Sequence, residues 1–491
     1  MTDTALAGQA GERTGVRPAR AGALQMNDYS AEDKRRGLHI AIIGGGIGGL
    51  AAARRLLRAG ASVTVLEGAP ILGGLAGTFE IAGTRLERHY HHVFLSDTDF
   101  IQLTHELGLD RELLWLESRM GFYTPGHVYP FGTPLELLRF GALSPIDRIR
   151  CGLILWHLQK RTEWHSLERV TAAEWLRPRA GKAVFRVVWE PLLKSKFGED
   201  WDRVSMAWLW ARIFVRAQSR RGLFARERLG YMRGSFHILL ERLAQEVVRL
   251  GGQVLTSAPV RRVLTDGRGR LAGLETPRGT IACDAAIATL QSPAFARLIE
   301  GVPGIPTSYV QMLRDWEYQG NICMVLQLRE SLSRIYWLNI ADPSVPFTAL
   351  VEHTNLAPRA WYEGKHIFYL GKYLRTTHPH WSLDDDDLVR EWLPHVRRIF
   401  PQFSEDLIEQ RWVFRAPYAQ PVVTVGYGER IPDLRTPLVG LYLANMTQIY
   451  PEDRGMNYSI RLGHRVADTV LQDAPMLMQA AAEPAHTPEA V

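Results

Sequence analysis

One stretch near the amino end, "HIAIIGGGIGGLAAARRLLRAGASVTVLE" (residues 39–67), constrains the fold more than any other part of the sequence. The apolar run His39–Ile43 predicts a short, buried parallel strand. Gly44, Gly46 and Gly49 follow it in a G-x-G-x-x-G pattern. A helix is expected next, over residues 48–59, because apolar residues recur there at helical spacing and Gly60 supplies a stop.

The glycines and a later acidic residue have separate physical roles. Gly44 allows a tight turn, Gly46 lets the backbone approach a pyrophosphate, and Gly49 lets the helix lie close to the strand. A second strand over Ser62–Leu66 ends at Glu67, about 20 positions beyond the glycines, where a carboxylate can bind ribose hydroxyls. Because all of these elements occur in order, the stretch predicts a βαβ unit that binds a dinucleotide.

The residues after Glu67 indicate which dinucleotide this is. The sequence "GAPILGGLAGTFEIAG" contains the pair Gly73–Gly74 and resembles the FAD-binding signature of the amine oxidase, phytoene desaturase and protoporphyrinogen oxidase superfamily. That superfamily usually has an arginine after the glycine pair, and Leu75 stands there in this chain. A middle segment, residues 251–290, is similar to the family's central FAD segment, in which the backbone at the position of Val260 meets the adenine.

The sequence "LVGLYLANMTQIYPEDRGMNYSIRLGHRVADTVL" near the carboxyl end resembles the C-terminal flavin segment of the same superfamily. It predicts a strand over 440–444 and a helix over 457–471. In the family this helix directs its amino end at the pyrimidine end of the flavin, where reduced flavin carries negative charge. The resemblance therefore implies FAD as cofactor, bound by Gly44, Gly46, Gly48, Gly49, Glu67, Gly73, Gly74, Leu75, Val260, Asn445, Met456 and Asn457.

The resemblance covers about residues 38–472 and implies an α/β fold. A Rossmann-like FAD-binding domain of the glutathione-reductase type would be built from three separated segments. An α+β substrate domain, with a mixed or antiparallel sheet and a helical insertion, would be built from the rest. The expected boundaries are a disordered leader at 1–37, FAD segments at 38–111, 231–293 and 428–473, a helical insertion at 112–230, a substrate sheet at 294–427 and a disordered tail at 474–491.

The stretch "TRLERHYHHVF" (Thr84–Phe94) places three histidines within four positions. We expect a strand there, so that His89 and His91 face one side while Tyr90 and His92 face the other. This arrangement would separate the histidines, and the chain contains no H-E-x-x-H pattern, so no metal site is expected.

A second polar group, in "VEHTN", contains Glu352 and His353. In the superfamily the corresponding sheet forms the wall opposite the flavin ring, so these residues are candidates for moving protons. An equally open alternative is that they cap strand ends and satisfy each other. The candidate catalytic bases are therefore His92, His353 and Glu352.

The resemblance implies hydride removal from a bulky, mostly apolar substrate such as an isoprenoid, a porphyrinogen or an amine. No second G-x-G-x-x-G occurs between a strand and a helix, so we expect the substrate itself to reduce the flavin. Oxygen, a quinone or another carrier would then reoxidise it.

Two alternatives stay open. The residues around His92 also resemble a stretch of flavin-dependent sugar mutases, which rearrange a nucleotide-sugar without net oxidation. The protein could also bind FAD as a non-catalytic partner.

Composition narrows the choice of partners and compartment. The chain of 491 residues has a formal charge of +6, but its arginines are scattered, so nucleic-acid binding is not expected. Its three cysteines form no CxxC pair, which favours a cytoplasmic location. The aromatic and arginine-rich residues 208–226 predict a core helix with a basic face, or alternatively a portal in peripheral contact with a membrane.

Overall fold

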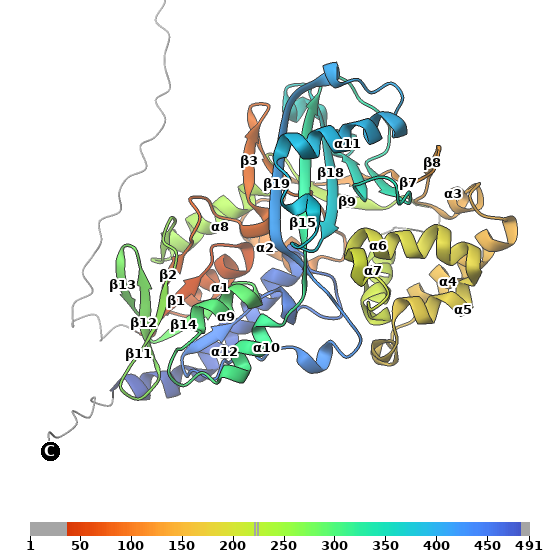
Figure 1. Ribbon diagram of the computed structural model, residues 1–491. Coiled ribbons are helices and arrows are strands. Elements are labelled where there is room, and N and C mark those ends of the chain that lie inside the picture. Colours follow the sequence, from red (N-terminus) through yellow and green to blue (C-terminus); the bar gives the residue numbers. More distant parts are fainter. Residues whose placement is uncertain (1–36, 220–221, 223–224, 483–491) are drawn as a thin grey trace, which may run out of the picture. The chain divides into compact units, whose positions relative to one another are not determined.

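The computed structural model describes residues 37–219, 222 and 225–482 (Figure 1). Its first layer is a five-stranded parallel sheet in the order β10-β2-β1-β14-β20. The strands come from three separated parts of the sequence and are β1 (His39–Ile43), β2 (Ser62–Leu66), β10 (Gln253–Leu255), β14 (Ala285–Ala288) and β20 (Leu441–Leu443). The strands predicted at 39–43 and 62–66 are confirmed at the same residues.

Both faces of this sheet are covered, so its strands are buried apolar runs rather than alternating ones. Ile40 and Ile42 of β1 belong to a core formed with helices α1 (Ile47–Arg58), α8 (His237–Arg249) and α12 (Met456–Ala482). The intervening Ala41 and Ile43 belong to a core on the opposite face. That core includes residues of α9 (Ser292–Ile299), α10 (Thr307–Arg314), β11 (Arg262–Thr265) and β12 (Leu271–Thr276), and β13 (Gly279–Ala282) pairs with β12.

A seven-stranded sheet in the order β19-β15-β18-β17-β16-β7-β8 forms the second layer. Only β16 and β7 pair in parallel, so the sheet is mixed. Figure 1 shows α11 (Asp385–Ile399) lying across β15, β18 and β19, with its apolar face in their shared core. The strands are β7 (Met120–Thr124), β8 (His127–Pro130), β15 (Tyr318–Leu328), β16 (Trp337–Ile340), β17 (Ala349–Glu352), β18 (His366–Leu374) and β19 (Ile408–Pro421).

A block of helices lies beside the end of this sheet that carries β7 and β8 (Figure 1). Its members are α3 (Pro134–Leu138), α4 (Pro145–Lys160), α5 (Ala172–Val184), α6 (Glu190–Phe197) and α7 (Met206–Gln218). Capping side chains mark several starts: Thr133 and Thr171 form capping boxes, and Ser144 caps α4. Trp208 and Trp210 of α7 are buried, so α7 is a core helix as the sequence predicts.

Three smaller elements complete the described chain. They are the hairpin β3 (Thr78–Ile81) and β4 (Thr84–Glu87), the sheet of β5 (Val93–Phe94), β9 (Arg228–Met232) and β6 (Leu113–Glu117), and helix α2 (Thr98–Glu106).

The structure bears differently on the two segments that were predicted to be disordered, residues 1–37 and 474–491. The leader at 1–37 falls, except for Gly37, outside the described residues. At the other end α12 continues to Ala482, past the expected boundary at 474, because residues 476–482 are strong helix formers and Leu477 is buried. None of the helices in the described ranges is long and apolar enough to span a bilayer.

Candidate active site

The two glycine loops face each other and leave a cradle between them. Gly44 has a φ of 115°, which only glycine adopts easily, and it turns the chain from β1 into α1. A Cβ on Gly46 would meet no atom within 4 Å, whereas one on Gly74 would lie 3.8 Å from Gly46 Cα. The Gly73 N–H donates to the Gly45 carbonyl at 3.0 Å and fixes the two loops together.

Helix α1 lies very close to its neighbours at two further glycines. A Cβ on Gly49 would stand 2.2 Å from the Gly44 carbonyl oxygen. A Cβ on Gly48 would stand 2.9 Å from the Ser459 carbonyl oxygen in α12. Only the lack of side chains lets α1 meet the glycine turn and α12 at these distances, which directs the amino end of α1 at the cradle.

The acidic residue predicted to bind ribose lies at the end of β2, beside the cradle. The Glu67 carboxylate accepts the N–H of Gly45 at 2.7 Å and the N–H of Ala69 at 2.8 Å. The segment leading to Val260 runs alongside, because the Ala258 N–H donates to the Glu67 carbonyl at 2.8 Å. The structure therefore brings Glu67 and the Val260 segment together at one end of the cradle.

A cavity of about 1180 Å³ opens beyond the other end of the cradle. Its walls come from strands of the seven-stranded sheet, from the helical block, and from the first turn of α12 with the loop before it. Leu75, Met456 and Asn457, three of the residues predicted to contact FAD, line it.

Asn457 gives the cavity a free hydrogen-bond donor that the polar edge of a flavin ring could accept. The residue is buried, and its Oδ1 accepts the Phe100 N–H at 3.0 Å. Its buried Nδ2 has no hydrogen-bond partner within the described structure, which leaves an N–H donor available to a ligand at the amino end of α12.

Asn445, the remaining predicted FAD contact, has a different environment. Its Oδ1 accepts the Thr447 N–H at 3.0 Å, and its Nδ2 donates to the Leu290 carbonyl at 2.8 Å. The side chain thus caps the turn after β20 and does not line the cavity.

The predicted strand over Thr84–Phe94 is wrong in its central part. Strand β4 ends at Glu87 and β5 begins at Val93, so the histidines lie in irregular backbone between them. As a result His89, Tyr90, His91 and His92 all line the cavity instead of alternating between two faces. Tertiary packing around the cavity, rather than the local pattern, sets this conformation.

Each of the three histidines has a separate partner. His89 Nδ1 donates to Asn321 Oδ1 at 2.9 Å, and His91 Nδ1 donates to the His89 carbonyl at 2.6 Å. His92 Nδ1 lies 3.2 Å from the Tyr336 hydroxyl. Burial lowers the pKa of His92 to about 3, so its ring is neutral at pH 7. Within the described ranges no group of three or more candidate ligands could hold a metal ion.

The structure does not bring Glu352 or His353 to the cavity lining. Glu352 is buried and accepts the Ser333 N–H at 3.0 Å and the Ser333 hydroxyl at 2.9 Å. His353 Nε2 lies 2.7 Å from the Tyr362 hydroxyl, and its ring packs edge-on against Tyr231. The contacts make both residues structural, as in the alternative, but each has its own partners and the two do not satisfy each other.

Several cavity residues with charge or hydroxyl groups were not among the sequence candidates, and five of them lie close together. These five are Lys196 on α6, Arg212 on α7, Tyr373 on β18, and Asp453 and Arg454 in the loop before α12. Two sequence signals touch this group: the aromatic and arginine-rich stretch 208–226, which contains Arg212, and "EDRG" (residues 452–455), three charged residues and a glycine just ahead of a predicted flavin-binding helix. Their convergence from four elements is visible only in three dimensions.

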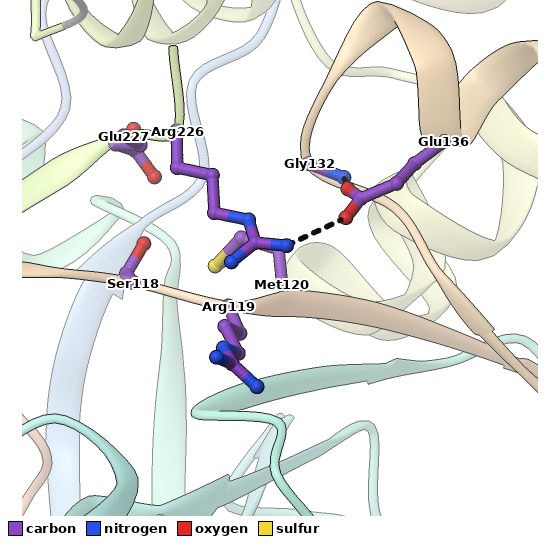
Figure 2. A pocket seen from close by; sticks show the side chains of 7 residues that line it. All are labelled: Ser118, Arg119, Met120, Gly132, Glu136, Arg226 and Glu227. Atoms are coloured by element: carbon purple, nitrogen blue, oxygen red, sulfur yellow. Dashed lines mark hydrogen bonds and ion pairs between the residues drawn. The ribbon is translucent and has the colours of Figure 1, made fainter.

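A second, much smaller hollow of about 10 Å³ adjoins the cavity and shares Met120, Gly132 and Glu227 with its lining. Figure 2 shows Arg226 reaching across it towards Glu136, at 3.7 Å between Nη2 and Oε1. A hollow of this size holds no more than about one water molecule. The large cavity is therefore the candidate active site.

Comparison with known proteins identifies the family. Residues 47–471 match the family model of flavin-containing amine oxidoreductases. The chain belongs to this family. It is 23% identical over 461 residues to the zeta-carotene desaturase of Solanum lycopersicum, which covers 83% of this chain and 76% of that protein.

Solved structures show the same α/β fold. The cyclohexylamine oxidase of Brevibacterium oxydans IH-35A superposes with a TM-score of 0.68 at 18% identity, over 89% of this chain and 100% of that one. Reduced UDP-galactopyranose mutase superposes with a TM-score of 0.67 at 16% identity, over 90% and 99% of the two chains. At these identities the likeness concerns the fold alone.

The family and the site geometry agree on the cofactor, which is FAD, and the protein is an FAD-dependent oxidoreductase. The open cradle at Gly46 and Gly74 fits the diphosphate, the Glu67 carboxylate and the Val260 segment fit the adenosine, and the unpaired Asn457 amide fits the flavin edge. When bound, FAD accepts a hydride from the substrate. The protein supplies a buried pocket and the groups that orient the substrate and move its proton.

Proposed function

We propose that this oxidoreductase is a dehydrogenase or desaturase that removes hydride from a bulky, mostly apolar substrate held in the large cavity. The observation that carries this proposal is the cavity's volume of about 1180 Å³, together with its apolar wall on the helical block. Small-molecule sites are usually about 300–1,000 Å³. This one can receive a flavin ring and an extended ligand, and its apolar wall consists of Leu137, Leu155, Val188, Leu192, Leu209, Ile213 and Phe214.

The same arrangement supports the assignment of the two sheets to different domains. We propose that the five-stranded sheet, assembled from three separated segments, is the core of the FAD-binding domain. The seven-stranded mixed sheet and the helices α3–α7 would form the substrate domain. The similarity to a carotene desaturase favours an isoprenoid over the other substrate classes.

His92 is the proposed acceptor of the proton that leaves with the hydride. It lines the cavity, and its pKa of about 3 keeps the ring unprotonated and able to accept. A ring with so low a pKa is a weak base. Loss of a hydride makes the neighbouring carbon strongly acidic, so a weak base suffices for the transfer.

Anaerobic titration of the FAD-loaded protein tests the proposed function. Isoprenoids, porphyrinogens and amines are added in turn, and the visible absorption of oxidised flavin is followed. We expect an isoprenoid to bleach it. Rearrangement of a UDP-sugar, seen only after reduction with dithionite, would favour the mutase alternative instead. Failure of every substrate class to bleach the flavin would favour the non-catalytic alternative.

An exposed apolar stripe on α4 supports peripheral contact with a membrane that delivers such a substrate. Ile146, Ile149, Leu153 and Trp156 are 71%, 58%, 61% and 58% exposed and follow helical spacing along one face. Leu135 and Leu138 of α3 are also exposed, and Trp156 lines the cavity as well. A membrane covering this stripe would therefore lie next to the cavity wall.

Exposed Arg139, Arg150 and Lys160 accompany the stripe, so the membrane surface proposed is an anionic one. Cosedimentation with phosphatidylserine vesicles tests this proposal. The double change Ile149→Glu and Leu153→Glu should release the protein, whereas Val248→Glu on the exposed face of α8 should not. Equal binding by both variants would exclude the stripe as the contact.

The electron acceptor is proposed to be oxygen, a quinone or another carrier.

A further inference from the structure

A cluster of charged side chains lies inside the cavity, away from the cradle. Lys196 Nζ is 3.3 Å from Asp453 Oδ2, and Arg212 pairs with the same oxygen. Trp208 Nε1 donates to the other carboxylate oxygen at 3.3 Å. The side chains of Lys196 and Asp453 are only 13% and 15% exposed, so water screens these charges weakly.

Arg454 adds a third cation to the cluster. One of its terminal nitrogens donates to the Tyr373 hydroxyl at 2.5 Å, and Lys196 Nζ lies 4.6 Å from the centre of the same ring. The buried Nε of Arg454 has no hydrogen-bond partner in the described part of the chain. Three cations therefore share one carboxylate, Asp453, and one donor is left unused.

The described neighbours do not balance this excess. Asp97 also lines the cavity, but the cation that acts on its carboxylate is Arg461, which lies outside the cluster. Arg216 and Glu227, also in the cavity wall, form their own pair at 3.1 Å and cancel each other. Burial lowers the pKa of His89 to about 3 and that of His91 to about 4, so both are neutral at pH 7. With Lys196 protonated, the cluster therefore holds two more positive than negative charges. Burial lowers the pKa of Lys196, and the neighbouring carboxylate of Asp453 opposes that shift.

Such an excess is costly in a buried site. An uncompensated buried ion is strongly destabilising, so proteins normally pair it. One of the two charges is balanced when FAD is reduced, because the reduced flavin is negative near N1. The other remains without a counterion, beside an apolar cavity that receives the substrate.

We propose that Lys196 and Arg454, held over the ring of Tyr373, bind an anionic head group at one end of the substrate. The substrate is then an amphipathic acid with an apolar, isoprenoid-like body, and not a neutral hydrocarbon. This inference rests on the proposed function for the apolar body. The head group is an oxyanion, which either a carboxylate or a phosphate monoester supplies.

Binding of matched ligands to the oxidised, FAD-loaded protein tests the inference. Farnesoic acid, farnesyl phosphate and methyl farnesoate share one apolar chain, and their affinities follow from the perturbation of the flavin spectrum or from calorimetry. We expect at least one of the two acids to bind at least about tenfold more tightly than the ester, the scale of one charge-assisted hydrogen bond. Whichever of the two acids binds more tightly identifies the head group. Equal affinity of acids and ester would overturn the inference.

Three variants make the test specific to the cluster. Lys196→Met should reduce the preference for the acid, and Asp453→Asn should increase it, because a competing carboxylate is lost. Lys160→Met changes an exposed cation of the same cavity and should leave the preference unchanged. Flavin content and thermal unfolding show that each variant is folded. An unchanged preference in both Lys196→Met and Asp453→Asn would overturn the inference.

Two further outcomes separate this inference from the proposed function. Tight binding of the acid without bleaching by any acid or hydrocarbon would support the head-group site and count against the dehydrogenase. Bleaching by a neutral isoprenoid as fast as by its acid would support the dehydrogenase and overturn the head-group site. Burial alone would raise the pKa of Tyr373, but Arg454 and Lys196 together lower it. A phenolate at Tyr373 would supply the missing negative charge. A tyrosinate band at neutral pH in the wild type, lost in Tyr373→Phe, would therefore also overturn the inference.

Discussion

Replacing Gly46 by alanine should weaken FAD binding without unfolding the protein. Gly46 has φ −74° and ψ 171°, which any residue adopts, so an alanine is not strained there. Its Cβ would meet no protein atom within 4 Å. The free energy of unfolding of the apoprotein should therefore change by less than about 0.5 kcal/mol, as for a substitution without contacts.

The cost should appear only when the cofactor binds. The open space beside Gly46 is where the cradle between the glycine loops admits the diphosphate, and a methyl group there would hold it away from the amino end of α1. Loss of one hydrogen bond to a charged group costs about 1.5–3 kcal/mol. The dissociation constant for FAD should thus rise roughly 10- to 150-fold.

The assay is a fluorescence titration of apoprotein with FAD, beside urea unfolding of the same samples. Gly49→Ala is the matched control, because its Cβ would stand 2.2 Å from the Gly44 carbonyl oxygen. That variant should lose about 1–3 kcal/mol of apoprotein stability through overpacking. If Gly46→Ala binds FAD as tightly as the wild type, the cradle is not the diphosphate site.

Three other predictions follow from buried groups. His92→Ala should reduce turnover severely while FAD stays bound, and release of FAD on purification would instead assign His92 a structural role. Burial raises the pKa of Glu87 from 4.5 to about 7, so the folded state binds this proton more tightly than the unfolded chain. The free energy of unfolding should therefore fall as the pH rises from 4.5 to about 7, by about 3 kcal/mol for this group. Urea titrations should show a smaller fall in Glu87→Gln. Burial also raises the pKa of Glu352 to about 7, so Glu352→Gln should likewise reduce the pH dependence of the free energy of unfolding. It should leave kcat unchanged, because Glu352 does not line the cavity. A loss of kcat with FAD retained would make Glu352 a catalytic candidate again.

The cofactor end of the molecule could be predicted from sequence because its signals are local. The strand, glycine turn and helix from His39 to Arg58 depend on residues close together in the chain, and a side chain at Gly44, Gly48 or Gly49 would be strained or would clash there. Glu67 follows at a distance set by one helix and one strand. The prediction over Thr84–Phe94 was wrong in its centre because the backbone between β4 and β5 follows the cavity wall, which distant residues build.

The substrate end could not be predicted in the same way, and the reason is physical. Lys196, Arg212 and Asp453 come from an inserted helical block and from the loop before the last helix, so their proximity depends on how the two layers pack. No local pattern records a charge excess shared across more than 200 residues. The glycine cradle fits the cofactor, whereas the charged cluster links the helical block to the cavity that receives the substrate. The uncompensated charge at that block is therefore where this chain's own specificity should be sought.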